Sequence, residues 1–244
     1  MAGRQVHQKV VNSLLRDIFS GRLRPGEKLS PERELSRAMN VDRTSLRVAL
    51  KQLESMNLLD IRPGDGIYVK DYLKHAGIDF LRLLFSQTDE AIVELVSDKY
   101  VVDEIWEWWT VTFPEVLKLG SKRFSMRDLK EMGDLIEREA KNLDDLEQVV
   151  EIEVAQQDLV ASVAKNMIFT LIFNSSRPLR KKIAEMFVRL VDRETLERFV
   201  LSKKEVLQYY LLNPDGDFDA MAEGYRQQID QNRQAVRKKL FEST

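Results

Sequence analysis

Residues 23–69 read LRPGEKLSPERELSRAMNVDRTSLRVALKQLESMNLLDIRPGDGIYV, and this stretch decides the fold of the first part of the chain. Ser30-Pro31-Glu32 predicts a helix start, because a serine cap, a proline in the first turn and an early acidic residue suit a helix N-terminus. Asp42 can cap a second helix. The buried stripe of that second helix is predicted to hold Leu46, Ala49, Leu50 and Leu53.

Two short apolar runs follow and predict a β-hairpin. Residues 58–61 and 67–69 flank Arg62-Pro63-Gly64-Asp65-Gly66, a glycine-rich turn. Upstream, apolar residues between positions 6 and 19 recur at helical spacing and predict one more helix. Three helices followed by a hairpin are typical of a winged helix-turn-helix, so the fold class is mainly α with a small hairpin wing.

The charge of the chain is divided unevenly along its length. Residues 1–76 carry 14 Lys and Arg against 9 Asp and Glu, whereas the remainder carries 24 against 31. A basic segment next to an acidic one indicates a nucleic-acid-binding module joined to a domain with another task. The excess of five positive charges is modest, and chance remains an alternative explanation.

The second helix of the motif carries side chains suited to reading DNA. Arginine can donate two hydrogen bonds to guanine, and Thr and Ser can contact bases or phosphates. An arginine at the start of the preceding helix could reach a phosphate, and a glycine at the wing tip permits close approach to the backbone of DNA. Each residue alone could equally lie on a solvated surface. The candidate DNA contacts are Arg33, Arg43, Thr44, Ser45, Arg47 and Gly64.

Residues 6–70 resemble the DNA-binding domain of GntR-type transcriptional regulators. The resemblance rests on PGEKLSPEREL, on VDRTSLRVALKQL and on the wing RPGDGIYV. It implies a homodimer that binds a palindromic double-stranded DNA operator through the six residues named above. The wing differs from related wings at its tip, where Pro63 and Asp65 replace basic residues, so contact with the minor groove is not expected there.

Beyond the wing the sequence predicts helices only. They are expected near residues 72–86, 89–113, 125–141, 145–174, 178–200, 203–212 and 217–241, with breaks at Gly120-Ser121, Arg177-Pro178 and residues 213–216. The expected domains are a DNA-binding domain over 1–71, a linker helix region over 72–88, and an all-α effector-binding bundle of about seven helices over 89–244.

A helical domain after such a module resembles the FadR-like subfamily. Its widespread version holds a divalent metal through a carboxylate and three histidines. Aligned on Asn166, this sequence places Glu153 and Gln157 at two of those positions, with Lys203 and Gln228 near the others. The chain has only two histidines, and Gln and Lys are poor metal ligands. No metal and no cofactor are therefore expected.

The resemblance then favours the metal-free, fatty-acid-responsive type, which implies a long-chain acyl-CoA effector that lowers the affinity for DNA. A different small carboxylate or metabolite is the alternative effector. Residues 180–182 could meet CoA phosphates or form a solvated charge run. The effector-pocket candidates, each of which could instead be core packing, are Trp106, Gln157, Phe169, Phe173, Phe187 and Tyr225.

Other classes of protein fit the sequence poorly. The chain has no cysteine, no glycine-rich phosphate loop and no histidine in a catalytic setting, so we expect no catalytic residues and no enzyme. An enzyme fused to the DNA-binding module, or a purely architectural DNA protein, are the remaining alternatives. The apolar runs are far shorter than the roughly 20 residues of a membrane span, so no membrane partner and a cytoplasmic location are expected.

Overall fold

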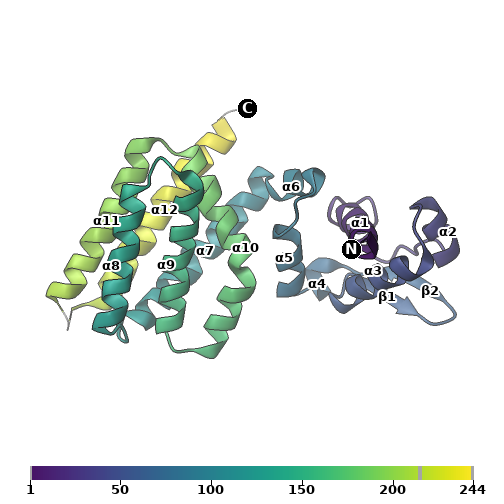
Figure 1. Cartoon of the computed structure of the whole chain (residues 1–244), viewed down its shortest axis with the longest axis horizontal. Coiled ribbons are helices and arrows are strands. Elements are labelled where there is room, and N and C mark those ends of the chain that lie inside the picture. The colour runs from purple at the N-terminus through teal and green to yellow at the C-terminus, as the bar shows by residue number, and fades with distance from the viewer. Residues whose placement is uncertain (1, 214–215, 243–244) are drawn as a thin grey trace. The chain divides into compact units, whose positions relative to one another are not determined.

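The computed structural model describes residues 2–213 and 216–242, which form two compact units (Figure 1). The first unit ends at Ser97 and the second begins at Asp98. Both are helical, apart from one small two-stranded sheet in the first unit. The predicted fold class, mainly α with a hairpin wing, is confirmed.

The first unit begins with the three helices and the hairpin that the sequence predicts. They are α1 (Ala2–Phe19), α2 (Glu32–Ala38), α3 (Arg43–Ser55), β1 (Leu59–Arg62) and β2 (Gly66–Val69). The strands are antiparallel, with Leu59 opposite Val69 and Ile61 opposite Ile67. This register sends alternate apolar side chains towards the helices, so the hairpin is fixed against α3.

The two helix starts expected from the sequence have different outcomes. Asp42 caps α3 by accepting a hydrogen bond of 2.8 Å from the Ser45 amide. The prediction for Ser30 was wrong, because Pro31 occupies the cap position of α2 without any side-chain cap and the helix begins at Glu32. Helix α2 therefore depends more on packing and on its acidic first turn than on a serine cap.

The apolar stripe of α1 packs on the stripe of α3 and on the hairpin. Burying these side chains holds α3 with its apolar face inward and its polar face outward. The stripes consist of Val10, Val11, Leu14, Leu15 and Ile18 on α1, Leu46, Ala49, Leu50 and Leu53 on α3, and Leu59, Ile67 and Val69 on the hairpin.

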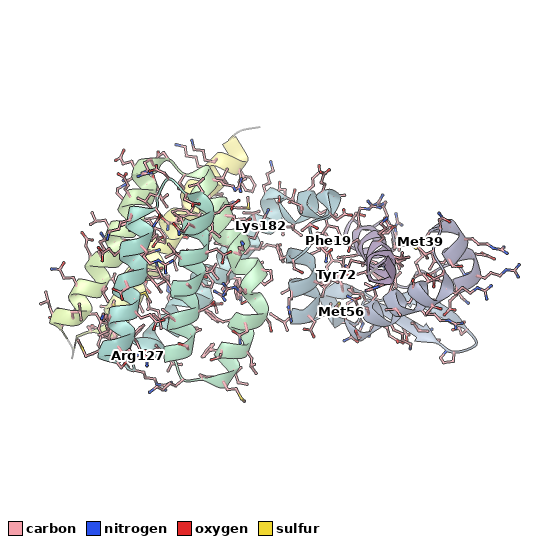
Figure 2. The ribbon with its side chains drawn as sticks, viewed as in Figure 1. Phe19, Met39, Met56, Tyr72, Arg127 and Lys182 are labelled. Atoms are coloured by element: carbon pink, nitrogen blue, oxygen red, sulfur yellow. The ribbon has the colours of Figure 1, made fainter. Side chains whose placement is uncertain are left out.

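Three short helices after the wing extend the same hydrophobic core. They are α4 (Tyr72–His75), α5 (Ile78–Phe85) and α6 (Glu90–Val96). Their buried side chains Phe80, Leu84, Ile92 and Val96 belong to the cluster formed by α1 and α3. The rings of Phe19 and Tyr72, labelled in Figure 2, lie 5.8 Å apart, and Phe80 lies 5.4 Å from Tyr72. The segment predicted as a linker thus packs as part of the first unit.

The second unit is a bundle in which the helices lie side by side (Figure 1). They are α7 (Lys99–Ser121), α8 (Met126–Lys141), α9 (Leu146–Val163), α10 (Met167–Leu190), α11 (Arg193–Leu212) and α12 (Phe218–Glu242). Helix α9 contacts α7, α8 and α10, while α12 packs along α7 and α11 along α8. Helix α9 is therefore central to the bundle.

Several predicted helix limits were wrong. The predicted helix over 145–174 is two helices, because Lys165 has a positive φ of 45° and Asn166 caps α10 through the amide of Ile168. The expected break at Arg177-Pro178 is absent, since Pro178 lies inside α10. The break lies instead at Asp192, which caps α11 by accepting from the Thr195 amide at 2.8 Å.

Other limits also shifted. The predicted helices over 72–86 and 89–113 are each divided, at Gly77 and at Asp98, where each new helix has its cap. Helix α7 continues through Gly120 to Ser121. Residues 214–215 of the expected turn lie outside the described part of the chain. None of the described helices is long and apolar enough to cross a membrane.

Candidate functional site

The exposed face of α3 carries most of the residues predicted to contact DNA. Arg43, Thr44 and Arg47 are exposed, while Leu46 on the opposite face is fully buried. Ser45 is half-buried, and its hydroxyl donates to Asp42 at 2.7 Å. Hydrogen bonds from the Ser45 hydroxyl and amide lower the pKa of Asp42. Ser45 thus already serves the helix cap in the free protein.

An ion pair joins α3 to the start of α2. The Nε of Arg47 donates to the Glu32 carboxylate at 2.8 Å, and the Arg47 side chain is still 66% exposed. Arg33, the next residue on α2, is exposed as well. A surface pair of this kind is worth only about 0–1 kcal/mol, so the guanidinium can exchange Glu32 for a DNA acceptor at little cost.

The wing gathers charged side chains around Tyr68. Gly64 at the turn is exposed with a φ of 77°, which favours glycine. Asp65 accepts from the Tyr68 hydroxyl at 2.9 Å and from Lys28 at 3.2 Å, and these two bonds lower the pKa of Asp65. Arg62 lies over the Tyr68 ring, 4.4 Å from its centre. Asp65 therefore keeps the cationic side chains of Lys28 and Arg62 close to the wing.

Sequence reasoning missed Lys28 and Arg62 as members of this surface. Lys28 pairs with Tyr68 as an isolated antiparallel bridge, which places the segment before α2 alongside the hairpin. Residues 26–29 (GEKL) could have indicated the position of Lys28, because they follow the Pro-Gly turn, which directs the chain back towards the hairpin. The cationic surface of the first unit thus extends from α3 to the wing.

The second unit contains a cavity lined by α7, α8, α9, α11 and α12. Its free volume is about 80 Å³. Most of the wall is apolar, with Phe113, Leu117, Leu129, Ile136 and Leu207 among its residues. The polar side chains of the wall are Ser121, Glu153, Gln156, Gln157, Lys203, Tyr210 and Tyr225.

The predicted effector residues are distributed between this cavity and the core. Gln157 and Tyr225 line the cavity. Trp106 and Phe187 are buried and line a smaller cavity with about 20 Å³ of space, which suffices for about one water molecule. Phe173 is buried against Trp109 and Phe113. Phe169, on the first turn of α10, is half-buried and lines neither cavity.

A buried lysine and two glutamates form the electrostatic centre of the second unit. Lys203 donates to both Glu139 oxygens at 2.9 Å and also to Glu153. Gln156 donates to Glu139 at 2.7 Å, and Gln157 donates to Glu153 at 2.9 Å. Burial alone would lower the pKa of Lys203, but the attraction of both carboxylates outweighs it and raises that pKa.

Burial and hydrogen bonds shift the pKa values of the acidic groups in and around this triad. Burial raises the pKa of Glu139, yet three N–H bonds directed at its carboxylate from Lys203 and Gln156 favour the ionised form. Burial, together with both nearby carboxylates, raises the pKa of Tyr225 well above its usual value, so this hydroxyl stays neutral. The triad Glu139–Lys203–Glu153 is therefore a buried cluster in which two glutamate side chains are hydrogen-bonded to one lysine.

A second buried cation lies beside the triad. Arg180 is fully buried, pairs with Asp158, and donates to the Gln157 side chain and the Phe173 carbonyl, both at 2.9 Å. Both terminal nitrogens of Arg180 are thus used within the protein, while its Nε is buried without a hydrogen-bond partner, and the residue does not lie on a solvated charge run. Lys181 is exposed and pairs with Glu151.

A surface groove between α11 and α12 adjoins the cavity. The two share Val206, Met221 and Tyr225 in their walls, so these three side chains separate the cavity from the groove. Gln228, which the sequence placed near a metal-ligand position, lines the groove but not the cavity. Within residues 2–213 and 216–242, no three His, Cys, Asp or Glu side chains are grouped to hold a metal ion.

The fold and these two surfaces define a class of protein: a winged helix-turn-helix joined to a helical unit with an internal cavity. Residues 6–69 match the family described as bacterial regulatory proteins, gntR family. The match covers the winged helix-turn-helix alone, so residues 6–69 are similar to the DNA-binding domain of bacterial regulatory proteins of the gntR type.

Individual relatives are similar over part of the chain. The transcriptional regulator Mce2R of Mycobacterium tuberculosis is 34% identical over 142 residues, which are 58% of this chain and 55% of that protein. A fatty acid metabolism regulator protein of Edwardsiella ictaluri is 32% identical over 89 residues, 36% of this chain and 37% of that protein. The chain thus spans little more than half the length of Mce2R.

One solved structure extends the likeness to the whole fold. The structure of Lar, described as controlling expression of the Listeria monocytogenes agr system, aligns with a TM-score of 0.50 at 18% identity. The alignment covers 98% of this chain and 97% of that one. At this identity the likeness establishes the arrangement of helices and nothing about the ligand.

Proposed function

We propose that this chain is a transcriptional regulator that binds a palindromic DNA operator as a homodimer and responds to a small molecule. The observation that carries this function is the polar face of α3, where Arg43, Thr44 and Arg47 are exposed over a buried apolar stripe. The GntR-family match over residues 6–69 supports it. One recognition helix reads one half-site, so two copies are needed for a palindrome.

The dimer contact has a candidate surface on the first half of α10. Met167, Ile168, Leu171 and Ile172 are exposed there, with Met167 at 72% and Leu171 at 53%. Four neighbouring apolar side chains exceed the scattered ones that a monomer surface normally shows. We assign this α10 patch to contact with the second copy.

The effector has two candidates that different observations support. A long-chain acyl-CoA is supported by the similarity to fatty acid metabolism regulators and by the apolar wall of the cavity. A smaller effector is favoured by the size of the cavity, whose free volume of about 80 Å³ is only several times the minimum of about 10–15 Å³ that one water molecule needs. A long acyl chain would require the helices of the bundle to separate.

The DNA-binding proposal is tested by selecting operator sequences from random duplex DNA with the full chain. We expect an inverted repeat, bound with an affinity that falls steeply with salt because phosphate counterions are released. Sedimentation equilibrium should show a dimer, and Leu171→Glu in the α10 patch should shift it towards monomer. Leu201→Glu, equally exposed at 53% on α11, is the matched control. Sequence-independent binding, or a wild-type monomer at micromolar concentration, would contradict the proposal.

The effector candidates are separated by calorimetric titration with acyl-CoAs of increasing length, followed by operator binding in their presence. Because each buried CH₂ contributes about 0.8 kcal/mol, an acyl-CoA effector should bind more tightly as its chain grows and should release the operator. Affinity independent of chain length would remove the acyl-CoA and leave the smaller effector.

A further inference from the structure

The polar side chains of the cavity wall offer hydrogen-bond acceptors and the Tyr225 hydroxyl, which can donate or accept, but no free cation. A lysine ammonium has three N–H donors, and those of Lys203 are used by two Glu139 oxygens and one Glu153 oxygen. Arg180 is paired with Asp158 and does not line the cavity. A carboxylate ligand would therefore meet the Glu153 carboxylate without finding a free positive charge.

Acceptor sites, in contrast, remain open in this part of the wall. Each Glu153 oxygen accepts one bond, from Gln157 and from Lys203, whereas a carboxylate has about four lone-pair sites. Among the described residues no donor reaches the Gln156 side-chain oxygen, and no hydrogen bond occupies the Tyr225 hydroxyl. The triad also places two glutamate side chains against a single lysine. These features suit a ligand that donates hydrogen bonds and is positively charged.

The remainder of the wall suits an organic cation with an apolar body. The rings of Phe113 and Tyr225 lie 5.6 Å apart at the cavity, and aromatic faces attract cations. The groove that adjoins the cavity is lined by exposed Glu205 and Asp217, and none of its described lining residues is Lys or Arg. Acidic groups on the surface beside the cavity raise the local concentration of cations.

We propose that this cavity binds a small organic ammonium, with Glu153 as its counter-ion. The ammonium takes the open acceptor sites of Glu153, Gln156 and Tyr225, and its apolar body lies against Phe113, Leu117 and Leu129. The proposal rests on the proposed function, since it names the effector class of the same regulator.

The test compares three probes of similar size: hexylammonium, 1-hexanol and hexanoate. Each is titrated calorimetrically into the full-length protein at neutral pH. We expect hexylammonium to bind at least tenfold more tightly than hexanoate, with 1-hexanol between them. Equal or tighter binding of hexanoate, or no binding of hexylammonium, would overturn the proposal.

Substitutions then test whether Glu153 causes the preference for hexylammonium. Glu153→Gln keeps the shape of the side chain and leaves the Glu139–Lys203 pair, so the ratio of hexylammonium to hexanol affinity should fall at least tenfold. Asp144→Asn removes a carboxylate that is 96% exposed and should leave the ratio unchanged. Tyr225→Phe, which keeps the ring, should weaken hexylammonium severalfold. An unaltered ratio in Glu153→Gln contradicts the assignment.

Operator binding by the same samples, measured without any probe, separates this proposal from the function on which it rests. Retained operator binding without ammonium binding removes only the ligand class. Loss of specific operator binding in the wild-type protein would remove the proposed function itself, whatever the cavity binds.

Discussion

Arg47 is the residue at which DNA recognition by α3 can be tested most directly. We predict that Arg47→Ala weakens specific operator binding by about 1–3 kcal/mol, the contribution of a good arginine contact to a base. Fluorescence anisotropy with the selected operator measures the change. Lys51→Ala, an exposed cation further along α3 that pairs with Glu54, is the matched control. Unchanged operator affinity in Arg47→Ala would refute the assignment of the recognition surface.

Substitution of Lys203 tests, also at the scale of single residues, how much the buried triad contributes to stability. Lys203→Met leaves Glu139 and Glu153 buried without their cation, and breaking a buried ion pair in this way costs about 3–5 kcal/mol. Urea unfolding followed by circular dichroism gives the free energy of unfolding. Arg193→Ala breaks two exposed pairs, with Asp144 and Glu197, and should change this energy little. A Lys203→Met protein as stable as wild type would show that the triad contributes nothing.

At the scale of elements, the wing yields a prediction about affinity without a change in specificity. Asp65 holds Lys28 and faces any approaching phosphate, so Asp65→Lys should strengthen binding to operator and to unrelated DNA by the same factor. Asp65→Asn, which only removes the negative charge, should have a smaller effect in the same direction. A change in the preferred operator sequence would mean that the wing contacts bases.

Elements also show what the sequence could and could not reveal. The helices and hairpin of residues 6–69 were predictable, because caps, turn residues and apolar spacing agree there. The continuity of α10 through Pro178 was not predictable, since local rules favour a break there whereas burial of Leu179, Arg180 and Ile183 accompanies the helix past it. Tertiary packing favours this continuity, and single-sequence patterns do not contain that packing.

At the scale of the whole molecule, the absence of metal chemistry is a testable expectation. Lys203 lies near the position of a metal-binding histidine in the resembled effector domain. Its ammonium is already bound by two carboxylates. We predict well under one equivalent of zinc, nickel or manganese per chain by elemental analysis of protein purified without chelators. A stoichiometric metal would show that Glu139 and Glu153 bind an ion in place of the lysine.

The internal cavity was only partly predictable at this scale. Gln157 and Tyr225 were found from the sequence, and both line it. The role of Glu139 was not foreseen, because its contact with Lys203 joins residues 64 positions apart and no local pattern indicates it. The aromatic residues Trp106, Phe173 and Phe187 lie in the core, where apolar side chains of any function gather.

The hydrophobic cluster shared by α1, α3 and the helices after the wing has a consequence for local unfolding. Phe80, Leu84, Ile92 and Val96 are buried in the same cluster as Leu14 and Leu50. Contiguous cores open as cooperative units, so the backbone amides of α6 should exchange hydrogen for deuterium with the same opening free energy as those of α1. An isolated fragment that stops at residue 71 would then lose protection throughout its helices, whereas one that ends at Ser97 would keep it.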